Sequence, residues 1–230
     1  MAKQKVEAAS VQVPEVMIHI PALPEEIIEV PITGVTPLIV NRFGPKVRQQ
    51  IRDREAGIKT PKKARDPIAE YEEAFYRLPD GTFGFPMLGF KACTVSACRF
   101  YDKSVTMKGV KQFIYFMADG YEVEDQVPLV RIHGEDPEKD ITMREDAVRG
   151  GVNATTLRYR PQFTNWSATL RIKFVSSAMN AQSLMSLIKS GGNYVGVGEW
   201  RPEKGNGGNS GINGTFTIGD YLVQSDEEVV

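Results

Sequence analysis

Residues 84–100 constrain the fold of this chain more than any other segment. They read Gly-Phe-Pro-Met-Leu-Gly-Phe-Lys-Ala-Cys-Thr-Val-Ser-Ala-Cys-Arg-Phe. Pro86 suits the first turn of a helix, where its missing N–H leaves no hydrogen bond unmade. Gly84 and Gly89 allow a sharp turn or a close backbone approach. Beyond them, apolar and small residues recur at helical spacing, which predicts a helix over residues 88–102 with one face in a hydrophobic core.

Two basic residues, Lys91 and Arg99, lie eight positions apart on this predicted helix. At that spacing they project from broadly the same side, one near the start of the helix and one near its end. A basic helix edge beside a glycine-bearing turn can seat a phosphate chain. An ordinary amphipathic helix with solvated lysine and arginine side chains explains the same residues.

Composition is typical of a soluble globular protein, since 41% of the 230 residues are hydrophobic and 25% are charged. No apolar run approaches the roughly 20 residues of a membrane span, and the first residues lack the apolar region of a secretory signal. Cys93 and Cys98 are five positions apart, a spacing that neither bridges nor ligates a metal easily. We therefore expect buried thiols in a reducing compartment, and a cytoplasmic protein with no membrane partner.

Charge is segregated along the chain although the formal net charge is only −1. Residues 42–65 hold nine basic residues against two acidic ones, and acidic stretches at 122–125, 135–140 and 226–228 balance them. Such segregation matters more to a polyanion than the total charge does. The basic segment is also too long for a simple connector, although a solvated loop is the common structure of a charge run.

The remaining patterns predict a series of short elements. Residues 1–24 suit an arm, 105–153 suit an insertion that projects from the main sheet, and 222–230 suit a loose acidic tail. A helix over 180–189 is expected to end at Gly191 and Gly192. Strands are predicted at 27–41 with a break near Gly34 and Pro37, at 82–85, 113–117 and 127–133, at 155–163 and 167–175 as a hairpin, and at 194–200 and 215–218.

Without the insertions, the element order is strand, helix, strand, strand, helix, strand. This order predicts an α+β fold with a ferredoxin-like, RRM-like βαββαβ core. We expect one domain over residues 1–230, with its core at about 25–104 and 154–221, a long basic loop, and a β-hairpin insertion. The sheet of such a core keeps one face open, and RNA-recognition folds bind with that face.

Three segments resemble the RAMP superfamily, the Cas7-like and Cas6-like proteins of CRISPR effectors. Residues 85–99 resemble the family's Ile-Pro-Gly-Ser-Ser-Leu-Lys-Gly-x-x-Arg turn and helix, 36–40 the end of its first strand, and 191–204 its C-terminal glycine-rich stretch. The chain also resembles a recurrent group of phage-encoded proteins, with Thr-Pro-Leu-Ile-Val near the start and Gly-Glu-Trp-Arg-Pro-Glu-Lys near the end.

The resemblance implies that the 105–153 insertion corresponds to the thumb of Cas7-like subunits, which polymerise along RNA. The family's lysine and arginine carry over to Lys91 and Arg99. The family's Ser-Ser is Leu88-Gly89 here, which weakens an inference of hydroxyl contacts. Nothing in the sequence matches the catalytic aspartate of the RNA-cleaving subunits.

We therefore expect a non-catalytic protein that binds single-stranded nucleic acid without sequence preference and forms a homo-oligomer or helical filament along the strand. DNA and RNA stay open as alternatives. Trp200 beside Arg201 can stack on a base, or Trp200 can close the edge of the core. Arg158, Tyr159 and Arg160 repeat this basic–aromatic alternation. The candidate binding residues are Arg42, Lys46, Lys62, Lys63, Arg65, Lys91, Arg99, Trp200 and Arg201.

Two other classes of function explain parts of the sequence. A structural phage assembly protein would use the basic segment to contact a partner subunit. A Cas6-like endoribonuclease would need a histidine, and His19 is the early candidate, although an isolated histidine in a strand-like context is more often structural. The acidic clusters lack calcium-loop spacing, and Gly196-x-Gly198 is no dinucleotide fingerprint, so we expect no cofactor, no metal and no catalytic residue.

Overall fold

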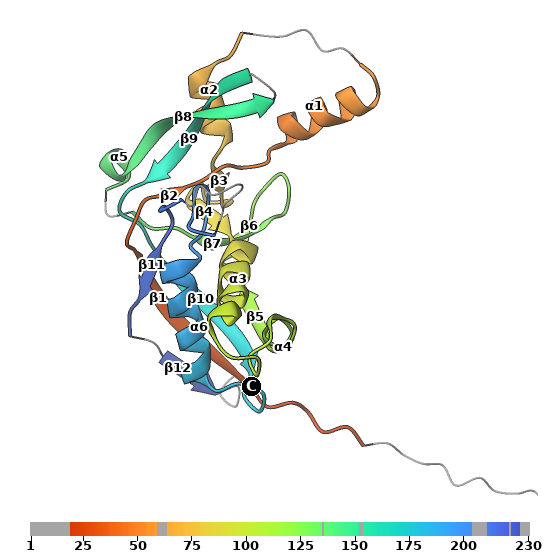
Figure 1. Ribbon diagram of the computed structural model, residues 1–230, viewed down its shortest axis with the longest axis vertical. Coiled ribbons are helices and arrows are strands. Elements are labelled where there is room, and N and C mark those ends of the chain that lie inside the picture. Colours follow the sequence, from red (N-terminus) through yellow and green to blue (C-terminus); the bar gives the residue numbers. More distant parts are fainter. Residues whose placement is uncertain are drawn as a thin grey trace, which may run out of the picture.

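The computed structural model describes residues 19–58, 64–134, 136–151, 154–203, 211–220 and 222–225. Over these residues the chain forms a mixed α+β protein with three antiparallel sheets. A layered body carries the largest sheet and two helices, and a second group of elements extends from one end of it (Figure 1). In the described part, no helix has the length and apolar character to cross a membrane.

The main sheet has the order β11–β1–β10–β5, and every neighbouring pair in it is antiparallel. An additional short strand, β12, also pairs with β1. Residues alternate along β1 and β10, so that one face of the sheet is apolar and buried and the other is more exposed. The strands are β1 (Glu25–Gly34), β5 (Ile114–Met117), β10 (Ser167–Val175), β11 (Phe216–Ile218) and β12 (Leu222–Ser225).

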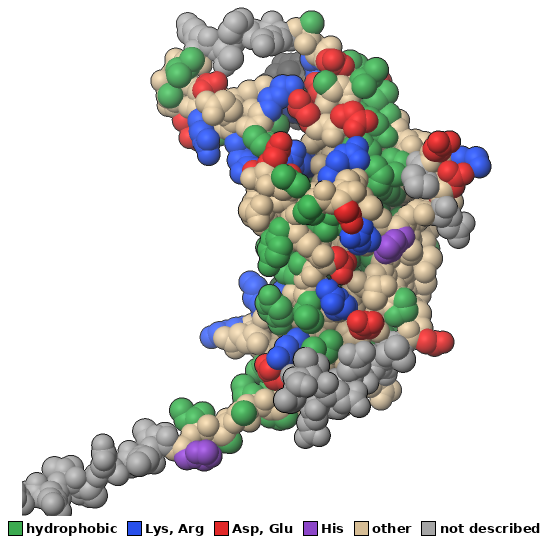
Figure 2. Space-filling model, turned by 180° about the vertical axis from the view of Figure 1, so that it is seen from behind, with side chains coloured by type: hydrophobic (Ala, Val, Ile, Leu, Met, Phe, Trp, Pro, Cys, Tyr) green, Lys and Arg blue, Asp and Glu red, His purple; other side chains and the backbone are tan. Residues whose placement is uncertain are grey.

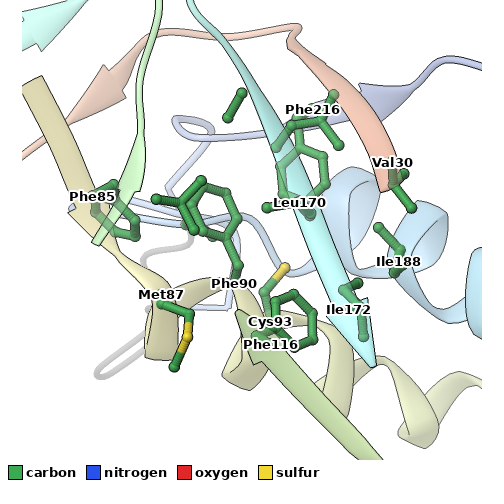
Figure 3. Packing of buried hydrophobic residues seen from close by; sticks show 14 of the residues in the cluster. Val30, Phe85, Met87, Phe90, Cys93, Phe116, Leu170, Ile172, Ile188 and Phe216 are labelled. Carbon is green, nitrogen blue, oxygen red and sulfur yellow. The ribbon is translucent and has the colours of Figure 1, made fainter. Parts of the chain in front are cut away.

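Helices α3 (Met87–Ser96) and α6 (Ala181–Tyr194) lie side by side and cover the apolar face of this sheet (Figure 1). Phe90 of α3, Ile188 of α6 and Phe116 of β5 belong to one buried cluster (Figure 3). This buried cluster continues into the other two sheets through Phe163 and Val130, so one core joins all three.

Two smaller sheets complete the fold. One has the order β2–β9–β8, in which β8 and β9 form a long hairpin, and the other has the order β3–β4–β7–β6. The first contains β2 (Leu38–Ile39), β8 (Ile141–Gly151) and β9 (Ala154–Phe163), and the second β3 (Tyr76–Arg77), β4 (Phe83–Pro86), β6 (Gly120–Tyr121) and β7 (Pro128–Arg131). The other helices are α1 (Pro45–Glu55), α2 (Pro67–Glu73), the 3₁₀ helix η1 (Ala97–Phe100), α4 (Met107–Phe113) and α5 (Pro137–Asp140).

The predicted hairpin between 155–163 and 167–175 is wrong, because the chain changes sheets between these strands. β9 pairs with β8 and β2, whereas β10 pairs with β1 and β5. The corner is fixed by Asp140: its carbonyl oxygen accepts from Thr164 N (2.8 Å), and its Oδ1 accepts from Asn165 Nδ2 (2.7 Å). Trp166 is buried just beyond the corner and donates from Nε1 to Thr36 O (2.9 Å).

The expected insertion also differs from the structure. β5 lies inside residues 105–153 but belongs to the main sheet, so the segment does not project as one piece. The projecting hairpin instead combines β8 with β9, although the sequence predicts that the residues of β9 belong to the core. At the other end, residues 222–225 of the expected loose tail pair with β1 as β12.

Two predictions around α6 are wrong because its glycines and those after it have other roles than the sequence predicts. α6 continues through Gly191 and Gly192 because these glycines allow close packing and do not cap the helix. A Cβ on Gly191 would lie 2.9 Å from Cys93 O, and one on Gly192 would lie 2.4 Å from Phe216 O. Residues 195–200 form turns and no strand, with Gly196 and Gly198 at φ of 69° and 78°.

Candidate nucleic-acid interface

A cavity of about 350 Å³ opens between α1, α2 and β9, at the end of the molecule away from the main sheet. Four basic side chains line it, together with the ring of Tyr159 and three glutamates. Acidic and basic side chains are closely mixed over this end of the molecule (Figure 2). The basic residues are Arg42, Lys46, Arg158 and Arg160.

Arg42 follows β2 and is neutralised inside the protein. Its Nη2 donates to Glu122 Oε1 (2.6 Å) and to Glu124 Oε2 (2.5 Å), and Asp125 Oδ2 lies 3.5 Å away. These carboxylates come from the loop between β6 and β7, which also pairs Asp125 with Arg48 of α1. Arg42, a predicted binding residue, is therefore mostly buried and paired with a cluster of carboxylates that the sequence does not predict.

Lys46 and Arg65 are more exposed, and each has an acidic partner on α2. Lys46 Nζ donates to Glu73 Oε1 (2.9 Å), and this bond raises the pKa of Lys46. The guanidinium of Arg65 donates to both carboxylate oxygens of Glu70 (2.8 and 2.6 Å), and these bonds raise the pKa of Arg65. The same guanidinium lies 5.9 Å from the centroid of the Tyr159 ring. Exposed ion pairs of this kind contribute only about 0–1 kcal/mol, so a phosphate can exchange into them at little cost.

Strand β9 supplies two further cations, Arg158 and Arg160, which are not among the binding residues predicted from the sequence. In the hairpin register, Arg158 is paired with Asp146, Tyr159 with Glu145 and Arg160 with Arg144. Arg158 is exposed, and the structure describes no ion pair for it. Arg160 is 9% exposed, and its Nε has no hydrogen-bond partner among the described residues.

A second group of candidates meets at the C-terminal end of α3, where Ser96 Oγ donates to Glu203 Oε1 (2.7 Å). Arg99 Nη2 and Arg201 Nε lie 2.8 Å and 3.8 Å from the carboxylate of Glu203, and Arg201 Nη1 donates to Gly198 O (3.1 Å). Arg201 and Glu203 line a smaller cavity of about 210 Å³ that runs along α3 and includes Gly89, Ala92 and Cys93. Trp200 is 37% exposed at a φ of 55°, so part of its ring is available to solvent.

Lys91 does not share a basic edge with Arg99, in contrast to the expectation from their spacing. Lys91 Nζ donates to Ile114 O of β5 (2.9 Å), and burial, with a smaller contribution from Lys111, lowers its pKa. Arg99 lies beyond the end of α3, in η1, where the tighter 3₁₀ winding changes the direction of its side chain. Lys62 and Lys63 lie outside the described residues.

Within the described residues, the histidines lie away from both cavities and the possible metal ligands are not grouped. The two histidines lie far apart on the surface (Figure 2), and neither lines the two cavities described above. Within the described ranges, no group of three or more His, Cys, Asp or Glu residues could hold a metal ion. Burial raises the pKa of Cys93 to about 12, which makes this thiol unreactive at neutral pH.

Comparison with known proteins finds similarity at the level of structure and none at the level of sequence families. No protein-family model and no curated protein matches the sequence. Among solved structures, a chain in the cryo-EM structure of the type III-B Cmr-β complex bound to cognate target RNA is similar, with a TM-score of 0.48 and 9% sequence identity. The match covers 88% of this chain and 61% of that chain, so this chain spans less than two thirds of its length. The resemblance to the RAMP superfamily rests on the sequence segments named above.

Proposed function

We propose that the protein binds the backbone of single-stranded nucleic acid, without catalysis and without sequence preference. The observation that carries this proposal is the cavity between α1, α2 and β9, whose lining includes four basic side chains and Tyr159. Phosphate groups need several cationic donors, and exposed aromatic rings stack on bases of any sequence. Arg52 and Arg54 of α1 and Arg158 of β9 add exposed cations for which the structure describes no acidic partner.

A ferredoxin-like core is part of this proposal. In chain order, β1, α3, β5, β10, α6 and β11 form a βαββαβ series. The main sheet has the order β11–β1–β10–β5, which places the strands of this series in the order fourth, first, third, second. The two helices of that series, α3 and α6, both cover one face, as in RNA-recognition folds (Figure 1). The open face carries an exposed tyrosine, Tyr115, directly opposite Lys173 in the strand register.

Assembly along the strand is the remaining part of the proposal. Helix α1 buries none of its residues in the isolated chain, and an 11-residue helix is only marginally stable by itself. A strand or a neighbouring copy would supply the missing support. α1 and the acidic α5 lie on opposite sides of the β8–β9 hairpin (Figure 1), so a contact between them in successive copies would be head-to-tail and could stay open.

Fluorescence anisotropy with labelled single strands of DNA and RNA, over a series of salt concentrations, tests the proposed function. We expect binding at low salt that weakens with a logarithmic slope of about 0.7 per phosphate contacted. Absence of binding at low salt would refute the proposal and favour a structural role in assembly. Shortening of the strand that His19→Ala abolishes would show that the protein is an endoribonuclease.

A further inference from the structure

The cavity between α1, α2 and β9 contains an arginine whose bonding is incomplete. Arg160 is about nine-tenths buried, its closest acidic partner is Asp146 at 3.7 Å, and its Nε donates to no described group. A buried guanidinium without full hydrogen bonding is costly. Arg158, two residues earlier on the same face of β9, brings a second cation to this cavity.

The acidic residues of the lining do not compensate these two arginines. Glu70 is held by the fork of Arg65, and Glu73 is held by Lys46. Glu124, the remaining glutamate of the lining, contacts Arg42 at 2.5 Å. Each of these carboxylates therefore balances a cation other than Arg158 and Arg160.

Glu124 differs from the other acidic partners of Arg42 in its exposure. The Glu124 side chain is 57% exposed, whereas those of Glu122 and Asp125 are 6% and 12% exposed. Glu122 also accepts from Asp125 N (2.6 Å) and so holds the loop together. Glu124 can leave Arg42 without disturbing the loop, and an incoming phosphodiester would replace one negative charge by another.

From this arrangement we infer that the cavity is a seat for one phosphate group. Arg158 and Arg160 bind this phosphate, and the phosphate displaces Glu124 from Arg42. The inference deepens the proposed function and rests on it for the source of the phosphate. The cavity has a volume of about 350 Å³, at the lower end of the range of about 300–1,000 Å³ that is typical of small-ligand sites. The phosphate belongs to a nucleic-acid strand or to a free nucleotide, and the experiment separates these sources.

Two pairs of single-charge variants test the seat, with anisotropy of a labelled strand short enough for one protein copy. Arg158→Gln removes a cation of the cavity, and Lys108→Gln removes an exposed cation of α4 that does not line it. A charge-assisted bond to phosphate predicts about tenfold weaker binding for Arg158→Gln and about twofold or less for Lys108→Gln. Melting temperatures within about 2 °C of wild type confirm that both variants fold.

The second pair removes a negative charge. Glu124→Gln takes away the competitor on Arg42, and Asp220→Asn removes an exposed carboxylate outside the cavity. We expect Glu124→Gln to bind the strand about threefold or more tightly than wild type, and Asp220→Asn to change affinity less than twofold. Equal affinities within either pair, with strand binding intact, would overturn the seat but leave the proposed function standing.

Titration with a nucleoside monophosphate, followed by calorimetry, distinguishes the two sources of phosphate. If the wild-type protein binds no strand but binds the monophosphate, and Arg158→Gln abolishes this binding, the seat stands and the proposed function fails. If it binds neither, both are refuted. If the wild-type protein binds the strand, and the affinities within each pair of variants differ as expected, the phosphate seat and the proposed function are both supported.

Discussion

Cys93 shows how burial sets the chemistry of a single side chain in this protein. The residue lies on α3 where Gly191 of α6 packs against its backbone, and it is 2% exposed. Burial raises the pKa of its thiol from 9.0 to about 12. Between these two values the native protein keeps a proton that the unfolded chain releases, so the free energy of unfolding falls as the pH rises.

We predict that Cys93→Ala makes the protein less sensitive to alkaline pH. Wild type should lose up to about 1.4 kcal/mol of unfolding free energy per pH unit above pH 9 through this thiol, and the variant should lack this loss. Urea denaturation at pH 8, 9 and 10 measures the difference in slope. Lys91, whose pKa is lowered, makes the free energy of unfolding rise with pH, but this contribution is the same in both proteins and cancels in the comparison. Parallel stability curves for the two proteins would contradict the prediction.

Single residues also show how much of the site was predictable. The basic character of residues 42–65 is visible in the sequence, and Arg42 and Lys46 do line the cavity. Their acidic partners were not predictable, because Arg42 and Glu122 are 80 positions apart and meet only through the folded chain. The alternation around Tyr159 was visible, but nothing local in the sequence showed that Arg160 would be buried with an unpaired Nε.

At the scale of elements, the close contact of α6 with β11 depends on a glycine that sequence analysis assigned to a helix cap. A methyl group on Gly192 would lie 2.4 Å from Phe216 O and 2.7 Å from Phe216 Cδ2. The backbone oxygen is part of β11 and cannot move by rotation of a side chain. The helix must therefore shift away from the strand if Gly192 gains a Cβ.

Gly192→Ala should destabilise the protein by about 1–3 kcal/mol, because overpacking outweighs the roughly 1 kcal/mol that alanine gains over glycine in a helix. Urea denaturation measures the change. Lys189→Ala, an exposed change on the same helix, is the control and should stay within about 0.5 kcal/mol of wild type. If Gly192→Ala is as stable as the control, the packing of α6 on β11 is looser than described.

Individual elements were easier to predict than their partners. β1, β2, β4, β5, β7, β11, α3 and most of α6 follow from local apolar patterns and turn residues. The pairing of β9 was missed because Asp140, 24 and 25 positions before Thr164 and Asn165, turns the chain into another sheet. The strand predicted over 194–200 failed because Gly196 and Gly198 adopt positive φ, which the sequence permits but does not require.

At the scale of the whole molecule, the distribution of charge favours contact between copies. α1 carries Arg52 and Arg54, which have no described acidic partner, and it projects from one side of the hairpin (Figure 1). α5 lies on the other side and carries the exposed Glu138. A protein with a net charge of −1 can coat a polyanion if opposite charges pair between copies and only the binding groove stays positive.

We therefore predict that the protein assembles head-to-tail with α1 of one copy against α5 of the next. Light scattering should show particles that grow with protein concentration and grow further on a long single strand, and negative-stain microscopy should show an open array. Arg54→Glu should reduce assembly because it places like charges together, and Glu138→Arg in the same chain should restore it by exchanging the two charges. A protein that stays monomeric at high concentration, with and without a strand, would refute the assembly. Failure of the charge exchange to restore it would place the contact elsewhere on the molecule.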